Sequence, residues 1–205
     1  MSIAQAAPRG QDPKRQRGHV RVAAIMKAGA ELFAEKGYDA TTMTEIASRS
    51  GTAIASLYRF FPTKESVAEV LLVKFAEHAL DELSALAARS RTMTPHDVAD
   101  AFVDVCFSLH LERRFAVRLA EAGGASEEQR NRLRAAMLDR VSKMLRGLIP
   151  SLSAARSRAM AAVLMMIFRS IGGIGDQKPS AQRVLLAETK EMIRLYLSDA
   201  AAAAN

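Results

Sequence analysis

The feature that most constrains the fold of this chain is a pair of short helical segments that meet at a glycine. Residues 43–49 and 53–60 have helical patterning, and Ser50-Gly51-Thr52 separates them. Pro62 ends the second segment, because a proline ring clashes with the preceding turn and removes a hydrogen-bond donor. Two helices joined by a three- or four-residue turn that contains glycine form the helix-turn-helix arrangement. The second helix has the length needed to lie in a major groove and present one face to base edges.

Helical signals extend over the rest of the 205 residues. Thr42 with Glu45 and Ser126 with Gln129 have the spacing of capping boxes, and Gly37 is placed to end the first helix. No strand or internal repeat is evident, so the sequence predicts an all-α fold with about nine helices. We expect them over 20–36, 43–49, 53–60, 64–87, 95 to about 111, a shorter segment to 122, 127–148, 153–171 and 180–198.

Positive charge is concentrated at the front of the chain. The net charge is +7, and residues 1–64 hold ten lysines and arginines against five acidic residues. Residues 1–18, with Lys14, Arg15 and Arg17, are expected to form a flexible basic arm. Such a distribution favours an anionic partner at the front, although a solvated basic surface alone would have the same composition.

The run AAIMKAGAELFAEKGYDATTMTEIASRSGTAIASLYRFFPTKESV closely resembles the N-terminal domain of the tetracycline-repressor (TetR) family. The shared features are the Leu-Phe-Ala-Glu-Lys-Gly-Tyr end of the first helix, Thr41-Thr42 before Glu45-Ile46-Ala47, Leu57-Tyr58, and Phe61-Pro62-Thr63-Lys64-Glu65. The resemblance implies a homodimeric regulator with a helix-turn-helix domain over 19–64 and a ligand-binding and dimerisation domain over 65–205. Its implied partners are an operator in double-stranded DNA and a small-molecule effector.

The resemblance also assigns DNA contacts by position. Thr42, Tyr58 and Lys64 correspond to phosphate contacts, and Met43, Ala53, Ile54, Ser56 and Arg59 correspond to positions near bases. Arg17 and Arg21 can reach along the backbone or into a minor groove. Thr52 and Ala53 depart from the Val and Ser frequent in the family, so the helix cap is expected to shift to Thr52. Among the groove-facing positions only Ser56 and Arg59 can form hydrogen bonds, which predicts contact of Arg59 with guanine and apolar contact with thymine methyl groups.

A second subunit is expected to cover the helix at 153–171. Residues 159–168 are apolar on all sides, and such a helix must be buried all round. With the last helix of each protomer it would form a four-helix interface about a two-fold axis. A central core helix in a monomer would have the same pattern. Gly172-Gly173-Ile174-Gly175 is expected to end this helix; it lacks the spacing of a phosphate-binding loop.

The larger domain offers a set of aromatic, sulfur-containing and titratable residues for an effector pocket. His78 and His110 are the candidates for polar contacts, and the ten methionines favour an apolar or amphipathic ligand. Plain core packing would equally place these side chains inside. The candidate pocket residues are Phe75, His78, Phe102, Cys106, Phe107, His110, Phe115, Met137, Met144 and Phe168.

Other function classes have weaker signals. No histidine follows a glutamate by three residues, so the di-iron pattern is absent, and we expect no metal, no cofactor and no catalytic residue. Cys106 and His110 share a helix face, but no orienting acid is visible beside them. The single cysteine and the absence of a signal peptide or of a membrane-length apolar run predict a cytoplasmic protein. A ligand-insensitive architectural or adaptor protein with the same DNA module stays an alternative.

Overall fold

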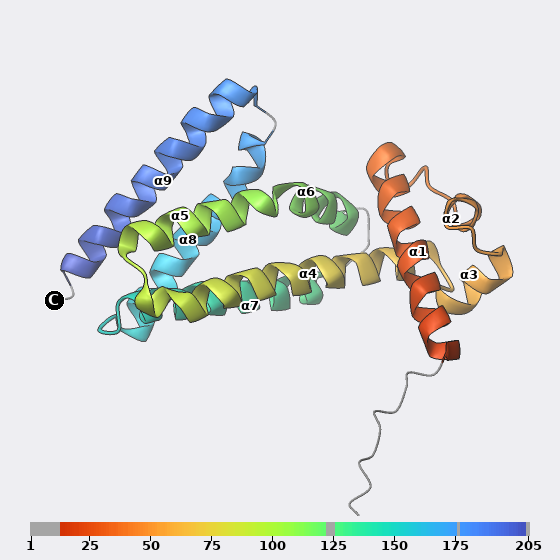
Figure 1. Cartoon of the computed structure of the whole chain (residues 1–205), viewed down its shortest axis with the longest axis horizontal. Helices are drawn as coiled ribbons and strands as arrows, with labels where there is room; N and C mark the ends of the chain where they lie inside the picture. Colours follow the sequence, from red (N-terminus) through yellow and green to blue (C-terminus); the bar gives the residue numbers. More distant parts are fainter. Residues whose placement is uncertain (1–12, 122–125, 176, 204–205) are drawn as a thin grey trace, which may run out of the picture. The chain divides into compact units, whose positions relative to one another are not determined.

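A computed structural model of the chain describes residues 13–121, 126–175 and 177–203. Over these residues it contains nine α-helices, one short 3-10 helix and no strand, which confirms the expected all-α class (Figure 1). The chain divides into two compact units, one up to Leu71 and one from Leu72 onward. The helices are α1 (Pro13–Lys36), α2 (Met43–Arg49), α3 (Ile54–Phe60), α4 (Lys64–Arg89), η1 (Ser90–Thr92), α5 (Pro95–Ser108), α6 (His110–Leu119), α7 (Glu127–Leu148), α8 (Ala154–Ile174) and α9 (Pro179–Ala202).

Helix starts follow the local capping signals. Reciprocal capping boxes open α2 at Thr42 with Glu45 and α7 at Ser126 with Gln129, as expected. A third box, between Thr94 and Asp97, opens α5. Each box satisfies backbone N–H groups that have no partner inside the helix, so these starts are set by residues three positions apart.

Several helix boundaries differ from the sequence expectation; α9, for example, ends at Ala202 instead of residue 198. α1 begins at Pro13 instead of residue 20, because proline is favoured in the first turn of a helix. Residues 13–18 of the expected arm are therefore helical, and its first twelve residues lie outside the described residues. α8 does not end before Gly172-Gly173 but continues to Ile174. Glycine weakens a helix by only about 1 kcal/mol per residue, and the buried Ile171 anchors this turn.

The core of the first unit lies between α1, α2, α3 and the first turns of α4. A close approach of α1 to α4 occurs at Gly29, where a Cβ atom would lie 2.9 Å from Cγ1 of Val67. The absence of a side chain at this position allows the two helices to pack. The fully buried apolar side chains of the unit are Ile25, Ile46, Leu57, Val67 and Ala68.

The second unit packs α5 against α9 and α7 against α8 (Figure 1). Polar contacts reinforce the α5–α9 pair. Arg194 on α9 donates two hydrogen bonds to the carboxylate of Asp100 on α5, at 2.7 and 2.6 Å. Lys190 lies 2.7 Å from the carboxylate of Asp104, one turn further along α5. These bonds fix the position of α9 on the unit in addition to its buried apolar residues.

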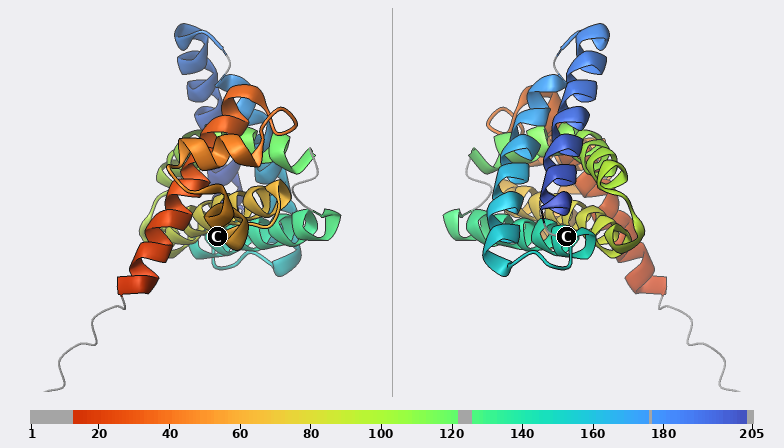
Figure 2. Two further views of the ribbon diagram at one scale, coloured as in Figure 1. Left: turned by 90° about the vertical axis from the view of Figure 1, so that its right-hand side faces the viewer. Right: turned by 90° about the vertical axis from the view of Figure 1, so that its left-hand side faces the viewer.

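One face made by α8 and α9 carries exposed apolar side chains, and no other helix of the second unit lies in front of these two helices in the right-hand view of Figure 2. Met166 is 58% exposed and Leu195 is 64% exposed. Within the chain, α8 is therefore not buried on all sides, and only part of the apolar pattern of α9 faces the core, including Ile193 and Leu197. We name this surface the α8/α9 face. Its exposed apolar residues are Val163, Met166, Val184, Leu185, Met192, Leu195 and Tyr196.

Candidate nucleic-acid interface

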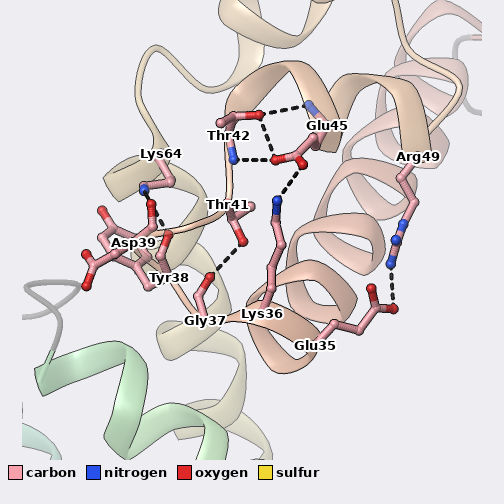
Figure 3. Close-up of polar contacts among 10 residues, drawn as sticks. All are labelled: Glu35, Lys36, Gly37, Tyr38, Asp39, Thr41, Thr42, Glu45, Arg49 and Lys64. Carbon is pink, nitrogen blue, oxygen red and sulfur yellow. Dashed lines mark hydrogen bonds and ion pairs between the residues drawn. The ribbon is translucent and has the colours of Figure 1, made fainter.

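The helix-turn-helix is held by a network of local polar contacts (Figure 3). The Thr42 hydroxyl accepts a hydrogen bond from the Glu45 amide at 3.3 Å and donates one to the Glu45 carboxylate at 2.7 Å. The same carboxylate pairs with Lys36 at the end of α1. The Lys36 hydrogen bond, followed by those from Thr42, lowers the pKa of Glu45 to about 2. The carboxylate is therefore charged at neutral pH and joins the start of α2 to α1.

The turn between α2 and α3 depends on glycine. Gly51 has a φ of 61°, a left-handed conformation that residues with a side chain rarely adopt. The next residue, Thr52, is buried, and its amide donates to the Ala47 carbonyl at 2.9 Å. The helix cap is Ala53, without a side-chain hydrogen bond, so the expectation that Thr52 caps α3 is wrong. The Thr52 hydroxyl points instead to the Ser50 carbonyl, at 3.5 Å.

α3 has one buried and one exposed face. Leu57 on α3 and Phe61 just after it are buried against the rest of the unit. Ile54 and Tyr58, one turn apart, are 41% and 48% exposed. Ala53 and Arg59 are also exposed, and the Arg59 guanidinium lies 5.3 Å from the centre of the Phe60 ring. The structure therefore brings four of the expected contact residues to the outside of the motif.

Met43 and Thr52 have a different placement. Met43, on α2, is 9% exposed, and Thr52 is 8% exposed, so both side chains belong to the core of the unit and not to the surface expected from the sequence. The sequence pattern did not distinguish them from their neighbours, because Met and Thr occur both inside and outside. Thr42, between α1 and α2, is exposed as expected.

Lys64 has a structural role that the sequence did not reveal. Its ammonium group donates to the carbonyl oxygens of Tyr38 at 2.8 Å and Asp39 at 3.2 Å, and it lies 4.3 Å from the Tyr38 ring centre. The Tyr38 hydroxyl donates to Glu65 at 2.8 Å. Burial, and then this hydrogen bond, raise the pKa of Tyr38. The start of α4 is thereby tied to the loop that precedes Thr42 (Figure 3).

The two N-terminal arginines lie beside the turn of the motif. Arg21 donates a hydrogen bond to the Ser56 hydroxyl at 3.4 Å, which joins α1 to α3. Arg17, one turn before it, is exposed. This unit contains a groove of about 530 Å³. The residues that line it are Gln16, Arg17, Val20, Arg21, Ala24, Ser50, Gly51 and Thr52. Cationic side chains, backbone and a hydroxyl group thus share one concave surface, which suits an anion.

The candidate pocket residues divide by burial. Five of them fill the core of the second unit, whereas Phe75, Phe107, His110 and Phe115 are half-buried. His78 is exposed and its ring Nδ1 lies 3.0 Å from the Glu112 carboxylate, a contact that raises the pKa of His78. His110 stacks on Phe107 with 4.5 Å between ring centres. The five core residues are Phe102, Cys106, Met137, Met144 and Phe168.

The surroundings of Cys106 do not suit a nucleophile. Burial raises the pKa of its thiol well above the usual value, so the reactive thiolate is disfavoured. Among the described residues, no group of three or more His, Cys, Asp or Glu could hold a metal ion. None of the helices within those residues combines the length and apolarity needed to cross a membrane.

Comparison with known proteins points to regulators of transcription. Residues 25–71 match the family model of bacterial regulatory proteins, tetR family. The uncharacterized HTH-type transcriptional regulator YvdT of Bacillus subtilis (strain 168) is 29% identical over 59 residues. That match covers 29% of this chain and 30% of YvdT, so it spans less than a third of either protein.

Solved structures match over most of both chains. A TetR/AcrR-family regulator from Thermobifida fusca YX-ER1 has a TM-score of 0.66 and 22% identity, covering 85% of this chain and 96% of its own. A tetR-family regulatory protein from Rhodococcus RHA1 has a TM-score of 0.66 and 20% identity, covering 86% and 96%. The regulator FadR from Bacillus subtilis, in complex with stearoyl-CoA, has a TM-score of 0.60 and 20% identity, covering 83% and 96%. At these identities the structures establish a shared fold.

Proposed function

By its N-terminal unit the chain belongs to the TetR family of bacterial regulatory proteins and is a DNA-binding transcriptional regulator, and on that premise we propose that it is a ligand-responsive repressor. It binds a palindromic operator as a homodimer, and a small molecule releases it. The observation that carries the proposal is α3, which buries Leu57 and leaves Ile54, Tyr58 and Arg59 outside.

We expect few hydrogen bonds between α3 and the bases. Arg59 can donate a bidentate pair to O6 and N7 of guanine, and Ile54 and Ala53 can contact thymine methyl groups. Ser56 is half-buried and accepts a hydrogen bond from Arg21, so Arg21 sets the orientation of its hydroxyl. The operator is therefore read by one strong polar contact and several apolar ones, with DNA shape supplying the rest.

Phosphate contacts are assigned to the residues around α3. Tyr58 and Thr42 present hydroxyl groups at exposed positions, and Arg17 adds a cation beside the groove. Lys64 has three N–H donors, of which two bond to backbone carbonyl oxygens. The third can reach a phosphate while the other two hold the preceding loop in place.

The α8/α9 face supports a homodimer. Seven large apolar side chains are exposed on these two helices. Groups of exposed apolar side chains are typical of protein interaction sites. A two-fold axis across this face would bury Met166 and Leu195 against their copies in a four-helix interface, and a two-fold protein fits a palindromic site.

A continuous helix supports the proposed ligand response. α4 begins at Lys64, within the DNA-binding unit, and ends at Arg89, within the larger unit. A ligand that shifts α4 would change the spacing of the two recognition helices in a dimer, and half-sites require a fixed spacing of about one helical turn of DNA. The FadR structure with stearoyl-CoA is a precedent for a small-molecule complex on this fold.

Selection of bound sequences from random duplex DNA, using the purified full chain, tests the operator and the dimer together. We expect enrichment of an inverted repeat, with an Arg59→Ala variant losing preference at one position of each half-site. Failure to enrich any sequence at low ionic strength would refute the proposal. The selected duplex then serves as the probe in a screen for small molecules that release the protein.

The filled core favours one other candidate function. Phe102, Cys106, Met144 and Phe168 leave almost no exposed surface in the second unit. A regulator with a permanently closed core would bind DNA as an architectural or adaptor protein without an effector. Release of the operator by any compound in the screen decides against that candidate.

A further inference from the structure

One arginine of the second unit occupies a position that apolar residues normally take. Leu109, just before α6, and Ala116 on α6 flank Arg113 at the spacing of one helix face, and both are buried. Arg113 itself is half-buried, and its guanidinium carbon lies 5.6 Å from the centre of the buried Phe168 ring on α8. The guanidinium of Arg113 therefore lies on the packed side of α6, where it contacts the ring of Phe168.

No acidic partner compensates this charge within the described part of the chain. The Arg113 guanidinium forms no hydrogen bond and no ion pair there, whereas Arg194 is paired with Asp100 and Arg132 with Glu128. Its charged neighbour is another cation, Arg169. Burial and, after it, the nearby Arg169 lower the pKa of Arg113.

The guanidinium nevertheless stays within reach of a ligand. Among the described residues, no fully buried side-chain nitrogen or oxygen lacks a hydrogen-bond partner. Because Arg113 has no partner there, its nitrogens must keep some contact with solvent. A cation that is partly withdrawn from water, and open on one side, binds an anion more strongly than a fully solvated cation does.

We propose that Arg113 is the anion-binding residue of the effector site. It takes a carboxylate or phosphate group through the paired N–H donors of its guanidinium, which match the geometry of both groups. The apolar part of the ligand then lies against the stacked, half-buried rings of Phe107 and His110, the second of which is one turn before Arg113. This inference rests on the proposed ligand response and adds the chemical class of the ligand: an organic anion with an apolar body.

Ligand chemistry can be tested with a matched set of probes on the purified full chain. Decanoate and decyl phosphate carry the two anionic groups on the same chain, decanol carries none, and acetate and inorganic phosphate have no apolar body. We expect one of the two long anions to bind at least about tenfold more tightly than decanol by isothermal titration calorimetry, because a charge-assisted pair strengthens binding by about that factor. Equal binding of decanol, or no binding of either long anion, would overturn the assignment.

Variants locate the effect. Arg113→Met should abolish the preference for the anion and leave decanol binding unchanged, whereas Arg118→Met, at an exposed position of the same helix, should keep the preference. A purely structural Arg113 predicts the reverse: Arg113→Met would lower the unfolding midpoint and leave the preference intact. Because the charge is uncompensated, we expect an equal or higher midpoint without ligand. If Arg113→Met does not fold, Arg113→Lys, which keeps the charge but not the paired donors, should reduce the anion preference.

Binding is measured here without DNA, so the two proposals can fail separately. If anions bind through Arg113 but never release the protein from the operator, the proposed anion site is supported and the proposed ligand response is refuted. If only neutral compounds release the operator, and they do so equally for the wild type and Arg113→Met, the ligand response is supported and the anion site at Arg113 is refuted.

Discussion

Two glycines in α1 should respond in opposite ways to the same substitution. A Cβ atom at Gly29 would lie 2.9 Å from Cγ1 of Val67, a stiff β-branched side chain that is fully buried. A Cβ atom at Gly18 would have no atom within 4 Å. Replacement of glycine by alanine in a helix stabilises it by about 1 kcal/mol, and overpacking in a core costs about 1–3 kcal/mol. We therefore expect Gly18→Ala to stabilise the protein and Gly29→Ala to destabilise it by up to about 2 kcal/mol.

The assay is urea unfolding at a fixed protein concentration, with the free energy of unfolding taken from the midpoint at constant slope. The difference between the two variants isolates the contact with Val67, since both share the gain in helix propensity. Val67→Ala provides the second test, because it removes the methyl groups that the new Cβ would meet. It should cost less in the Gly29→Ala background than in the wild type. Equal stabilisation by both glycine substitutions would show that α1 and α4 do not approach as closely as described.

Four further results are expected. Arg59→Ala should relax base preference at one position by about 1–3 kcal/mol, whereas Lys64→Ala should weaken binding to all duplexes alike; equal losses on every operator would show that the two roles are wrongly assigned. The logarithm of DNA affinity should fall with the logarithm of salt concentration by about 0.9 for each phosphate neutralised, and a flat profile would contradict the cationic contacts. Met166→Glu should shift the protein from dimer to monomer in analytical ultracentrifugation, and an unchanged dimer would place the interface elsewhere. The pairing of His78 with Glu112 raises the pKa of His78, so its stabilisation of the fold is complete below the ordinary histidine pKa and is lost as pH rises through the raised pKa. Glu112→Gln should remove this part of the pH dependence of the free energy of unfolding. An unchanged pH profile would refute the pairing.

The helices were largely predictable because their starts and stops depend on nearby residues. Thr42 with Glu45 and Ser126 with Gln129 cap α2 and α7 within three positions of chain. Gly51 allows the turn of the motif because of its own backbone freedom. Gly172-Gly173 predicted the end of a helix, but the packing of α8 carries the helix on to Ile174.

The candidate site was only partly predictable. The sequence by itself determined an all-α chain, the position of the helix-turn-helix and the exposed face of α3, since each follows from helix periodicity and punctuation. Only the tertiary structure decided that Met43 is buried, that Lys64 is bonded to the Tyr38 loop, and that Arg113 faces Phe168. These contacts join residues from different helices. Their existence depends on how distant segments pack, which no pattern of neighbouring residues records.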